Sequence, residues 1–228
     1  MAVMSNMLLV PRLSLPPDAA TLADGVVVAV RDGIASGELE PGTTYSVYQL
    51  ADLLGVSRSP VREGLLRLAE VGLVQINRNR GFLVRRPSAH DVEEIAQIRL
   101  ALEPYAAARA ATGADDDALD AVKESLEAMR RAVASGDEAA FWPADRALHH
   151  ALLHASGNAR AAAVVEQLRA TTALLGPPTT DGGRTLEDVL EEHVPVVDAV
   201  LARDPERART AMRAHLESTR DLLLALFA

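Results

Sequence analysis

Residues 45–84 read YSVYQLADLLGVSRSPVREGLLRLAEVGLVQINRNRGFLV. Ser46 and Ser57 each stand where a side-chain oxygen can cap a following helix, and Gly55 breaks the helical pattern between them. The stretch therefore predicts a short helix before Gly55 and a second helix from Ser57 to about Val71, joined by a three-residue turn.

The flanking residues extend this pattern. Upstream, apolar side chains at helical spacing predict a helix over residues 19–36. Downstream of Gly72, the β-type runs LVQI and FLV flank the basic turn NRNRG and predict a hairpin. Two helices joined by a short turn and followed by a hairpin indicate a winged helix-turn-helix, whose second helix enters the major groove of DNA.

The second helix of the pair carries side chains that suit contacts with DNA. Arg58 and Arg62 lie four residues apart on one face near its N-terminus, where each guanidinium could bind guanine bidentately. Ser57 and Ser59 could hold phosphate with the help of the helix N-terminus. Arginines at this spacing are also common on a solvated helix face, but their place after the turn favours DNA binding.

The remaining features of this segment fit the same interpretation. Arg78 and Arg80 on the hairpin tip would reach the neighbouring minor groove or its phosphates. The apolar positions expected to form the buried side of the second helix are Val61, Leu65, Leu66 and Leu68.

Residues 22–86 resemble the DNA-binding domain of the GntR family of bacterial regulators. The family pattern has a leucine-alanine pair before the turn, here Leu50 and Ala51, and then the run VSRSPVRE, here at residues 56–63. The resemblance implies that the two arginines of this run contact bases and that Gly81 belongs to the wing tip.

The sequence departs from the family pattern at one place. Members commonly carry a glutamate-arginine pair in the helix before the turn, where this chain has Val47 and Tyr48. This chain therefore lacks the DNA contact that the family arginine makes. Either its operator differs from the usual operator of the family, or the Tyr48 hydroxyl contacts phosphate instead.

Charge is distributed unevenly along the 228 residues. The formal net charge is −9, yet residues 41–86 carry seven basic and three acidic side chains. Residues 87–228 carry fourteen basic and twenty-four acidic ones. A positive segment attached to an acidic one predicts a small nucleic-acid reader joined to a partner domain.

Composition limits the remaining possibilities. Cysteine is absent, which excludes disulfides and thiolate chemistry and fits a cytoplasmic protein. The apolar start of the chain is interrupted by Pro11 and is too short to span a membrane. We expect a flexible tail over residues 1–17, the reader over 18–86 and a second domain over 87–228.

The second domain is expected to be a helical bundle. Helical patterns cover about 88–111, 115–135, 138–155, 159–175, 184–203 and 205–226, and the breaks between them carry Gly, Pro, Asp or Asn. The fold class is therefore mainly α, with a small β-hairpin wing in the reader.

Histidines and carboxylates in this bundle suit a metal. Asp145 and His149 are four apart on one helix, and His193 and His215 lie on the last two helices, which are expected to form an antiparallel pair. Three imidazoles and a carboxylate suit Zn²⁺, with Ni²⁺ and Mn²⁺ as alternatives. Spacing alone does not decide which residues bind the metal, because His150 and His154 are also four residues apart.

The stretches ADRALHHALLHASGN and EEHVPVVDAVLARDPERARTAMRAHL resemble the FCD effector-binding domain of the FadR-like GntR subgroup. The resemblance implies Asp145, His149, His193 and His215 as the metal ligands. It also implies a functional pair at Arg99 and Glu103, where the arginine would bind the carboxylate of a small organic acid. A simple helix salt bridge is the other interpretation of that pair.

Two other functions compete with regulation. A metal-dependent hydrolase could use the same histidines and aspartate, but a general base is lacking and the reader would have no role. A dimerisation module that has lost its small-molecule ligand would keep the fold but would not need the metal-binding residues. We therefore expect a homodimer that represses transcription from a palindromic operator and is modulated by a small carboxylate.

Overall fold

The structure is a computed structural model that describes residues 13–77, 80–175, 180 and 183–227. The chain divides into two compact units between Arg86 and Pro87. Most of the predicted tail, and Arg78 of the predicted hairpin tip, lie outside the described residues.

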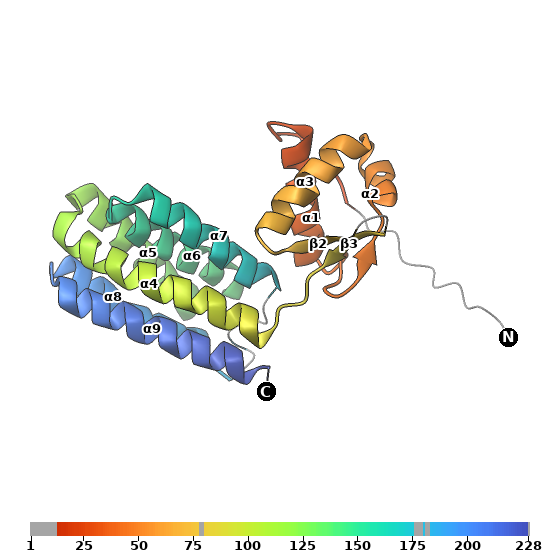
Figure 1. The fold of residues 1–228 in the computed structure, drawn as a ribbon. Helices are drawn as coiled ribbons and strands as arrows, with labels where there is room; N and C mark the ends of the chain where they lie inside the picture. The colour runs from red at the N-terminus through yellow and green to blue at the C-terminus, as the bar shows by residue number, and fades with distance from the viewer. Residues whose placement is uncertain (1–12, 78–79, 176–179, 181–182, 228) are drawn as a thin grey trace. The chain divides into compact units, whose positions relative to one another are not determined.

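The first unit is a winged helix-turn-helix. Its elements in chain order are α1 (Leu22–Ala35), β1 (Thr44–Tyr45), α2 (Val47–Leu54), α3 (Arg58–Glu70), β2 (Val74–Asn77) and β3 (Gly81–Val84) (Figure 1). Gly55 adopts a φ of +67° directly after α2, and α3 begins three residues later. β3 pairs antiparallel with both β1 and β2. The predicted motif is confirmed, and β1 is a strand that the sequence pattern did not indicate.

The helices α1 and α3 approach closely because α3 has a glycine at their contact. A β-carbon at Gly64 would lie 2.9 Å from Val26 Cγ1 and 3.0 Å from the carbonyl oxygen of Ala23. Any larger residue would push the two helices apart. Gly64 therefore allows α3 to pack closely against α1.

The buried face of α3 differs from the prediction at one residue. Val61, Leu65 and Leu68 are buried as expected, but Leu66 is 56% exposed. The expectation for Leu66 was wrong because it lies four residues after Arg62 and so shares the exposed face of that arginine. Leu22 at the start of α1 is likewise exposed.

The packed part of this unit begins before the expected boundary at residue 18. Leu13 is buried and lies against Gly33 of α1. Its apolar side chain covers the space that the glycine leaves open, so burial of apolar surface holds this segment in place.

The start of β3 requires glycine. Gly81 has a φ of +101°, which residues with a side chain rarely adopt, and a β-carbon there would lie 2.0 Å from the carbonyl oxygen of Tyr45. The close approach of β3 to the end of β1 thus explains the residue by packing, independently of any contact with DNA.

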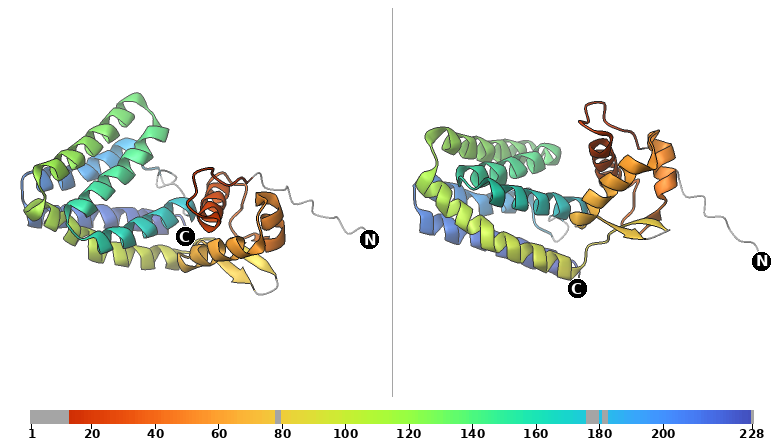
Figure 2. Two further views of the ribbon diagram at one scale, coloured as in Figure 1. Left: turned by 90° about the horizontal axis from the view of Figure 1, so that it is seen from above. Right: turned by 45° about the horizontal axis from the view of Figure 1, so that its top comes forward.

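The second unit is helical throughout its described residues, as predicted. Its elements are α4 (Ala89–Gly113), α5 (Asp116–Ser135), α6 (Glu138–Ala155), α7 (Ala159–Leu175), α8 (Leu186–Leu201) and α9 (Pro205–Ala225). α4 and α9 lie side by side, and α8 packs against both α9 and α5 (Figures 1 and 2). Among the described helices, none is both long enough and apolar enough to cross a membrane.

Local sequence fixes where these helices begin. Ser88 and Thr185 each start a helix with a capping box, in which the serine or threonine and an aspartate three residues later satisfy each other's backbone N–H groups. Alanines on α4, including Ala107 and Ala110, are fully buried and allow close helix packing. The core formed in this way surrounds a group of buried polar side chains.

Candidate functional sites

The first candidate site is the exposed face at the start of α3. Ser57, Arg58, Ser59 and Arg62 are all exposed. Ser57 occupies the N-cap position of α3 but makes no capping hydrogen bond, so its hydroxyl is available to a ligand. The Arg58 guanidinium lies over the ring of Tyr48, with its carbon 4.8 Å from the ring centre. This cation–π contact restricts the conformations of the Arg58 side chain. The ring belongs to Tyr48, which stands where the family pattern has the arginine of a glutamate-arginine pair.

A third arginine on α3 has a structural role instead. Arg67 Nη1 lies 2.6 Å from Asp24 Oδ1 on α1, and its Nη2 lies 2.6 Å from Glu63 Oε1. Its charge is matched within the protein, whereas Arg58 and Arg62 have no ion pair among the described residues. The unmatched positive charge of α3 is thus concentrated at its N-terminal end, and Arg80 is exposed beside the turn between β2 and β3.

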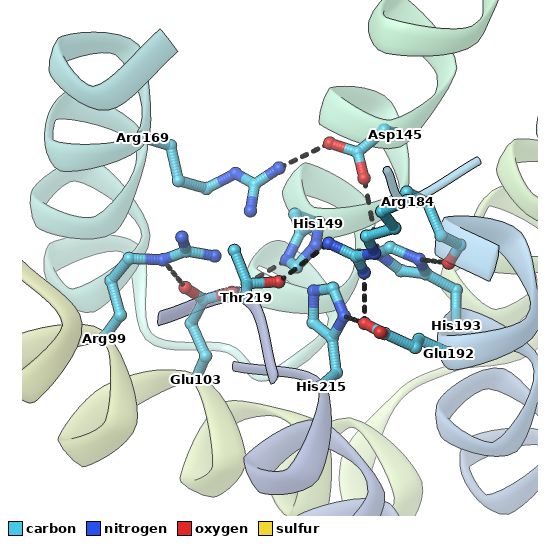
Figure 3. A network of polar contacts seen from close by, with 11 residues as sticks. Arg99, Glu103, Asp145, His149, Arg169, Arg184, Glu192, His193, His215 and Thr219 are labelled. Carbon is cyan, nitrogen blue, oxygen red and sulfur yellow. Dashed lines mark hydrogen bonds and ion pairs between the residues drawn. The ribbon is translucent and has the colours of Figure 1, made fainter. Parts of the chain in front are cut away.

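The second candidate site lies inside the helical unit, where three histidines from different helices converge (Figure 3). They are His149 on α6, His193 on α8 and His215 on α9, and all three are buried. One ring nitrogen from each lies within 4.8 Å of the others. The Nε2 atoms of His149 and His193 are 3.0 Å apart.

The other ring nitrogen of each histidine is held by an acceptor. His149 Nδ1 donates to Glu103 Oε2 at 2.7 Å, and His193 Nδ1 donates to a backbone carbonyl of its own helix at 2.7 Å. His215 Nδ1 donates to Glu192 Oε2 at 2.9 Å. In a neutral imidazole this leaves Nε2 as an acceptor, so lone pairs face one another across a short distance. Such an arrangement suits a cation bound to all three Nε2 atoms.

Asp145 borders this cluster from α6. Its Oδ1 lies 3.3 Å from His193 Nε2, and its Oδ2 accepts a hydrogen bond from Arg169 Nη2 at 2.7 Å. Burial alone would raise the pKa of Asp145, but the charge of Arg169 together with the nearby histidines lowers that pKa to about 2. The group is an ionised carboxylate with one oxygen directed at the histidines.

Arg99 and Glu103 form a buried pair on α4. Arg99 Nε lies 2.5 Å from Glu103 Oε1, while the other oxygen of Glu103 holds His149. Burial alone would raise the pKa of Glu103, but the charge of Arg99 and the contacts with His149 hold it well below its usual range. Both oxygens of Glu103 are therefore engaged inside the protein, and Glu103 positions Arg99 and His149.

Burial also acts on the three imidazoles. It lowers the pKa of His149 to about 4, and the charge of Arg169 acts in the same direction. It lowers the pKa of His193 and takes that of His215 well below its usual value. Burial thus favours the neutral imidazole, which is the form that binds metals.

A pocket adjoins this network between α4, α7 and α9. Its lining is largely apolar, with Val92, Ile95 and Leu216, and it also includes the side chains of Arg99 and Arg220. Largely apolar walls with guanidinium groups suit a small molecule that has an anionic end and an apolar body.

Several polar residues of this network were not predicted from the sequence. Arg169 pairs with Asp145, and Arg184 pairs with Glu192, whose carboxylate also accepts from His215 (Figure 3). Arg169 lies on α7 and Arg184 directly precedes the N-cap of α8, and in the sequence each looks like a surface residue. The packing of these segments beside the histidines shows their roles.

Comparison with known proteins identifies both units. Residues 22–84 match the model of the bacterial regulatory proteins of the gntR family, and residues 94–218 match the FCD domain. A "Probable D-xylose utilization operon transcriptional repressor" of Paenarthrobacter nicotinovorans is 34% identical over 212 residues, which cover 90% of this chain and 88% of that protein. The transcriptional repressor RspR of Escherichia coli K12 is 30% identical over 179 residues, 78% of each chain.

A solved structure agrees with these relatives. McbR/YncC of E. coli has a TM-score of 0.74 and 25% identity, covering 92% of this chain and all of that one. Because these proteins and domains are regulators, the comparison decides against the hydrolase interpretation. The chain belongs to the GntR family of DNA-binding transcriptional regulators and carries an FCD domain.

Proposed function

We propose that this regulator represses transcription by binding an operator with α3, as a homodimer that places one α3 on each half of a palindromic site. The observation that carries the proposal is the pair of exposed arginines, Arg58 and Arg62, directly after the three-residue turn. Two of the relatives are named as repressors, which supports the direction of regulation.

Each exposed group at this face has a distinct expected role. Arg58 and Arg62 bind guanine edges in the major groove, and Ser57 and Ser59 bind phosphate at the helix N-terminus. Arg80 reaches phosphates or the adjacent minor groove from the hairpin. Phosphate contacts set the register of the protein, and base contacts select the operator.

The helical unit binds a divalent metal through the Nε2 atoms of His149, His193 and His215, with Asp145 as the carboxylate ligand. Two Zn–N bonds of about 2.0–2.1 Å at a tetrahedral angle separate their nitrogens by roughly 3.3 Å. That separation is close to the 3.0 Å between His149 Nε2 and His193 Nε2. Zn²⁺ is our first choice, and Ni²⁺ and Mn²⁺ suit the same donors.

The effector is a small organic acid whose carboxylate binds Arg99. Glu103 holds Arg99 through Nε, which leaves the terminal nitrogens of the guanidinium for bidentate binding of a carboxylate. The pocket beside Arg99 accepts the apolar part of the acid. When bound, the metal would supply positive charge and a further point of attachment for the acid.

Effector binding alters operator affinity only if the acid binds more tightly to one arrangement of the dimer than to another. Residues from α4, α6, α8 and α9 meet at the site, so a ligand there changes the relative stability of alternative helix packings. By reciprocity, operator DNA would change the affinity for the acid by the same factor.

The test combines DNA binding with ligand titration. Fluorescence anisotropy on the promoter of the regulator's own gene measures operator affinity, with small mono- and dicarboxylates and D-xylose added in turn. We expect a carboxylate to weaken binding, and Arg99→Met to abolish that response while leaving operator affinity intact. Arg109→Met removes an exposed arginine of the same helix and is the matched control. A response to D-xylose alone would contradict the carboxylate proposal.

Metal content tests the buried site separately. Atomic emission of the purified protein should show less bound metal in His193→Ala than in the parent. His90→Ala removes an exposed histidine and should change nothing. Unchanged metal content in His193→Ala would place the metal elsewhere.

A further inference from the structure

A second pair of histidines lies on α6, outside the buried site. His150 and His154 are four residues apart, so both project from one face of the helix. Their side chains are 58% and 49% exposed, in contrast to the buried neighbour His149. The two rings stack, with centres 4.1 Å apart and planes inclined by 22°. The Nε2 atoms of both rings lie within 3.5 Å of one carboxylate oxygen.

That oxygen belongs to a carboxylate from the next helix. Glu166 of α7 places Oε1 3.5 Å from His150 Nε2 and 3.3 Å from His154 Nε2. One donor atom from each of the three residues lies within 4.8 Å of the other two. The cluster therefore joins α6 to α7 through two nitrogens and one oxygen.

The carboxylate oxygen at the centre of this cluster makes no hydrogen bond. Within the described part of the chain, Glu166 Oε1 is shielded from solvent, and the two histidine nitrogens are its near contacts without a hydrogen bond to either. A buried acceptor in this state usually indicates a bound water or ion. Two imidazole nitrogens and a carboxylate oxygen are the donor set of first-row transition metals rather than of Ca²⁺ or Mg²⁺.

We propose that His150, His154 and Glu166 form a second metal site, on the surface of the helical unit, that binds Zn²⁺ or a related transition-metal dication. Three protein ligands leave at least one coordination position open to water or to an external ligand. The site differs from the buried one in its ligands and in its exposure, and it does not depend on the proposed function.

A metal at this position would connect α6 and α7, the two helices that carry Asp145 and its partner Arg169. Asp145 lies on α6, its partner Arg169 lies on α7, and Glu166 is three residues before that arginine. Fixing α7 on α6 at the surface would thus stabilise the buried ion pair one turn away. Occupancy of the surface site should raise the thermal stability of the helical unit.

Counting bound Zn²⁺ in four full-length proteins tests the proposal. Chelator-treated wild type, His193→Ala, His150→Ala/His154→Ala and the triple variant are dialysed against Zn²⁺ alone, and bound metal is measured by atomic emission. We expect two equivalents in the wild type, one in each of the first two variants and none in the triple variant, because the described residues contain two separate clusters. A wild type with one equivalent that only His193→Ala removes would overturn the surface site and leave the buried site intact. If His193→Ala binds as much as the wild type and the double variant binds none, the buried site fails and the surface site stands.

The affinity for Zn²⁺ and the thermal stability test the surface site independently. Glu166→Gln keeps the shape of the side chain and should weaken Zn²⁺ binding at the surface site at least about tenfold, since even loss of an outer-sphere partner costs that much. His90→Ala, another exposed histidine with a glutamate four residues on, is the control and should bind like the parent. Excess Zn²⁺ should raise the melting temperature of His193→Ala but not that of the triple variant. Equal shifts in these two proteins would overturn the proposal.

Discussion

The two units hold their arginines in different ways. On α3, Arg58 and Arg62 are exposed, and Arg58 lies over the face of an aromatic ring. In the helical unit, Arg99 is buried and Arg169 is mostly buried, and each is held by a carboxylate. An exposed, unpaired guanidinium remains free to bind a polyanion such as DNA. A buried and paired guanidinium holds other groups in place, so its removal lowers the stability of the protein.

The largest effect is expected at the exposed arginines. Arg58→Ala/Arg62→Ala should weaken operator binding on the order of 10³-fold, because each loses a bidentate base contact. The fold should be unaffected, since both side chains are exposed. Fluorescence anisotropy at moderate salt measures the loss, and Arg130→Ala/Arg131→Ala, which removes two exposed arginines of the helical unit, is the charge-matched control. Tight operator binding by the double variant would contradict the assignment of this face.

A large loss of stability is expected at the buried ion pair. Arg169→Met leaves the Asp145 carboxylate buried without its partner and should destabilise the protein by about 3 kcal/mol in urea denaturation with metal removed. Adding Asp145→Asn should restore part of that loss. The surface pair of Arg131 and Glu124 provides the control, and Arg131→Met should change stability by less than about 1 kcal/mol. Equal effects at both pairs would remove the distinction drawn here.

A smaller effect is expected where α3 sits on α1. Gly64→Ala introduces a β-carbon 2.9 Å from Val26 and should destabilise the protein by about 1 kcal/mol, even after the gain in helix propensity. Gly113→Ala is the matched control, because a β-carbon on that α4 glycine would meet nothing within 4 Å. Gly113→Ala should be neutral or slightly stabilising. A stable Gly64→Ala would show that α1 and α3 can separate at little cost.

The smallest effect is expected at Tyr48. Tyr48→Ala removes the ring beneath Arg58 and should weaken operator binding by about twofold to fivefold. Tyr48→Phe keeps the ring and should bind like the parent in the same anisotropy assay. If Tyr48→Phe is as weak as Tyr48→Ala, the hydroxyl contacts phosphate and the stacking of Arg58 is not the reason for the residue.

The sequence predicted the first unit better than the second because its signals are local. Serines at the N-cap positions, of which Ser46 makes capping hydrogen bonds and Ser57 makes none, together with a turn glycine and apolar periodicity mark α2 and α3 within a span of 25 residues. The bounds of the predicted helices in both units also agree with the structure to within three residues. The two-residue strand β1 escaped prediction because it exists only through its pairing with β3.

The buried network could be predicted only in part. Its histidines stand out because histidine is rare in this chain, with six in 228 residues. Arg169 and Glu192 did not stand out, since charged residues are common on helices and their partners lie on other helices. The same reason explains Glu166, whose closeness to two histidines depends on how α7 packs against α6. Contacts between helices distant in sequence leave no periodic signal.

The anchoring of each histidine through Nδ1 bears on how the regulator can respond to oxidants. The donors around His149, His193 and His215 are nitrogen and oxygen atoms, and the chain contains no cysteine. Peroxides act on thiol-based regulators by converting thiolates to sulfenic acids or disulfides. This pocket offers no thiolate, so that route of oxidative inactivation is closed to it.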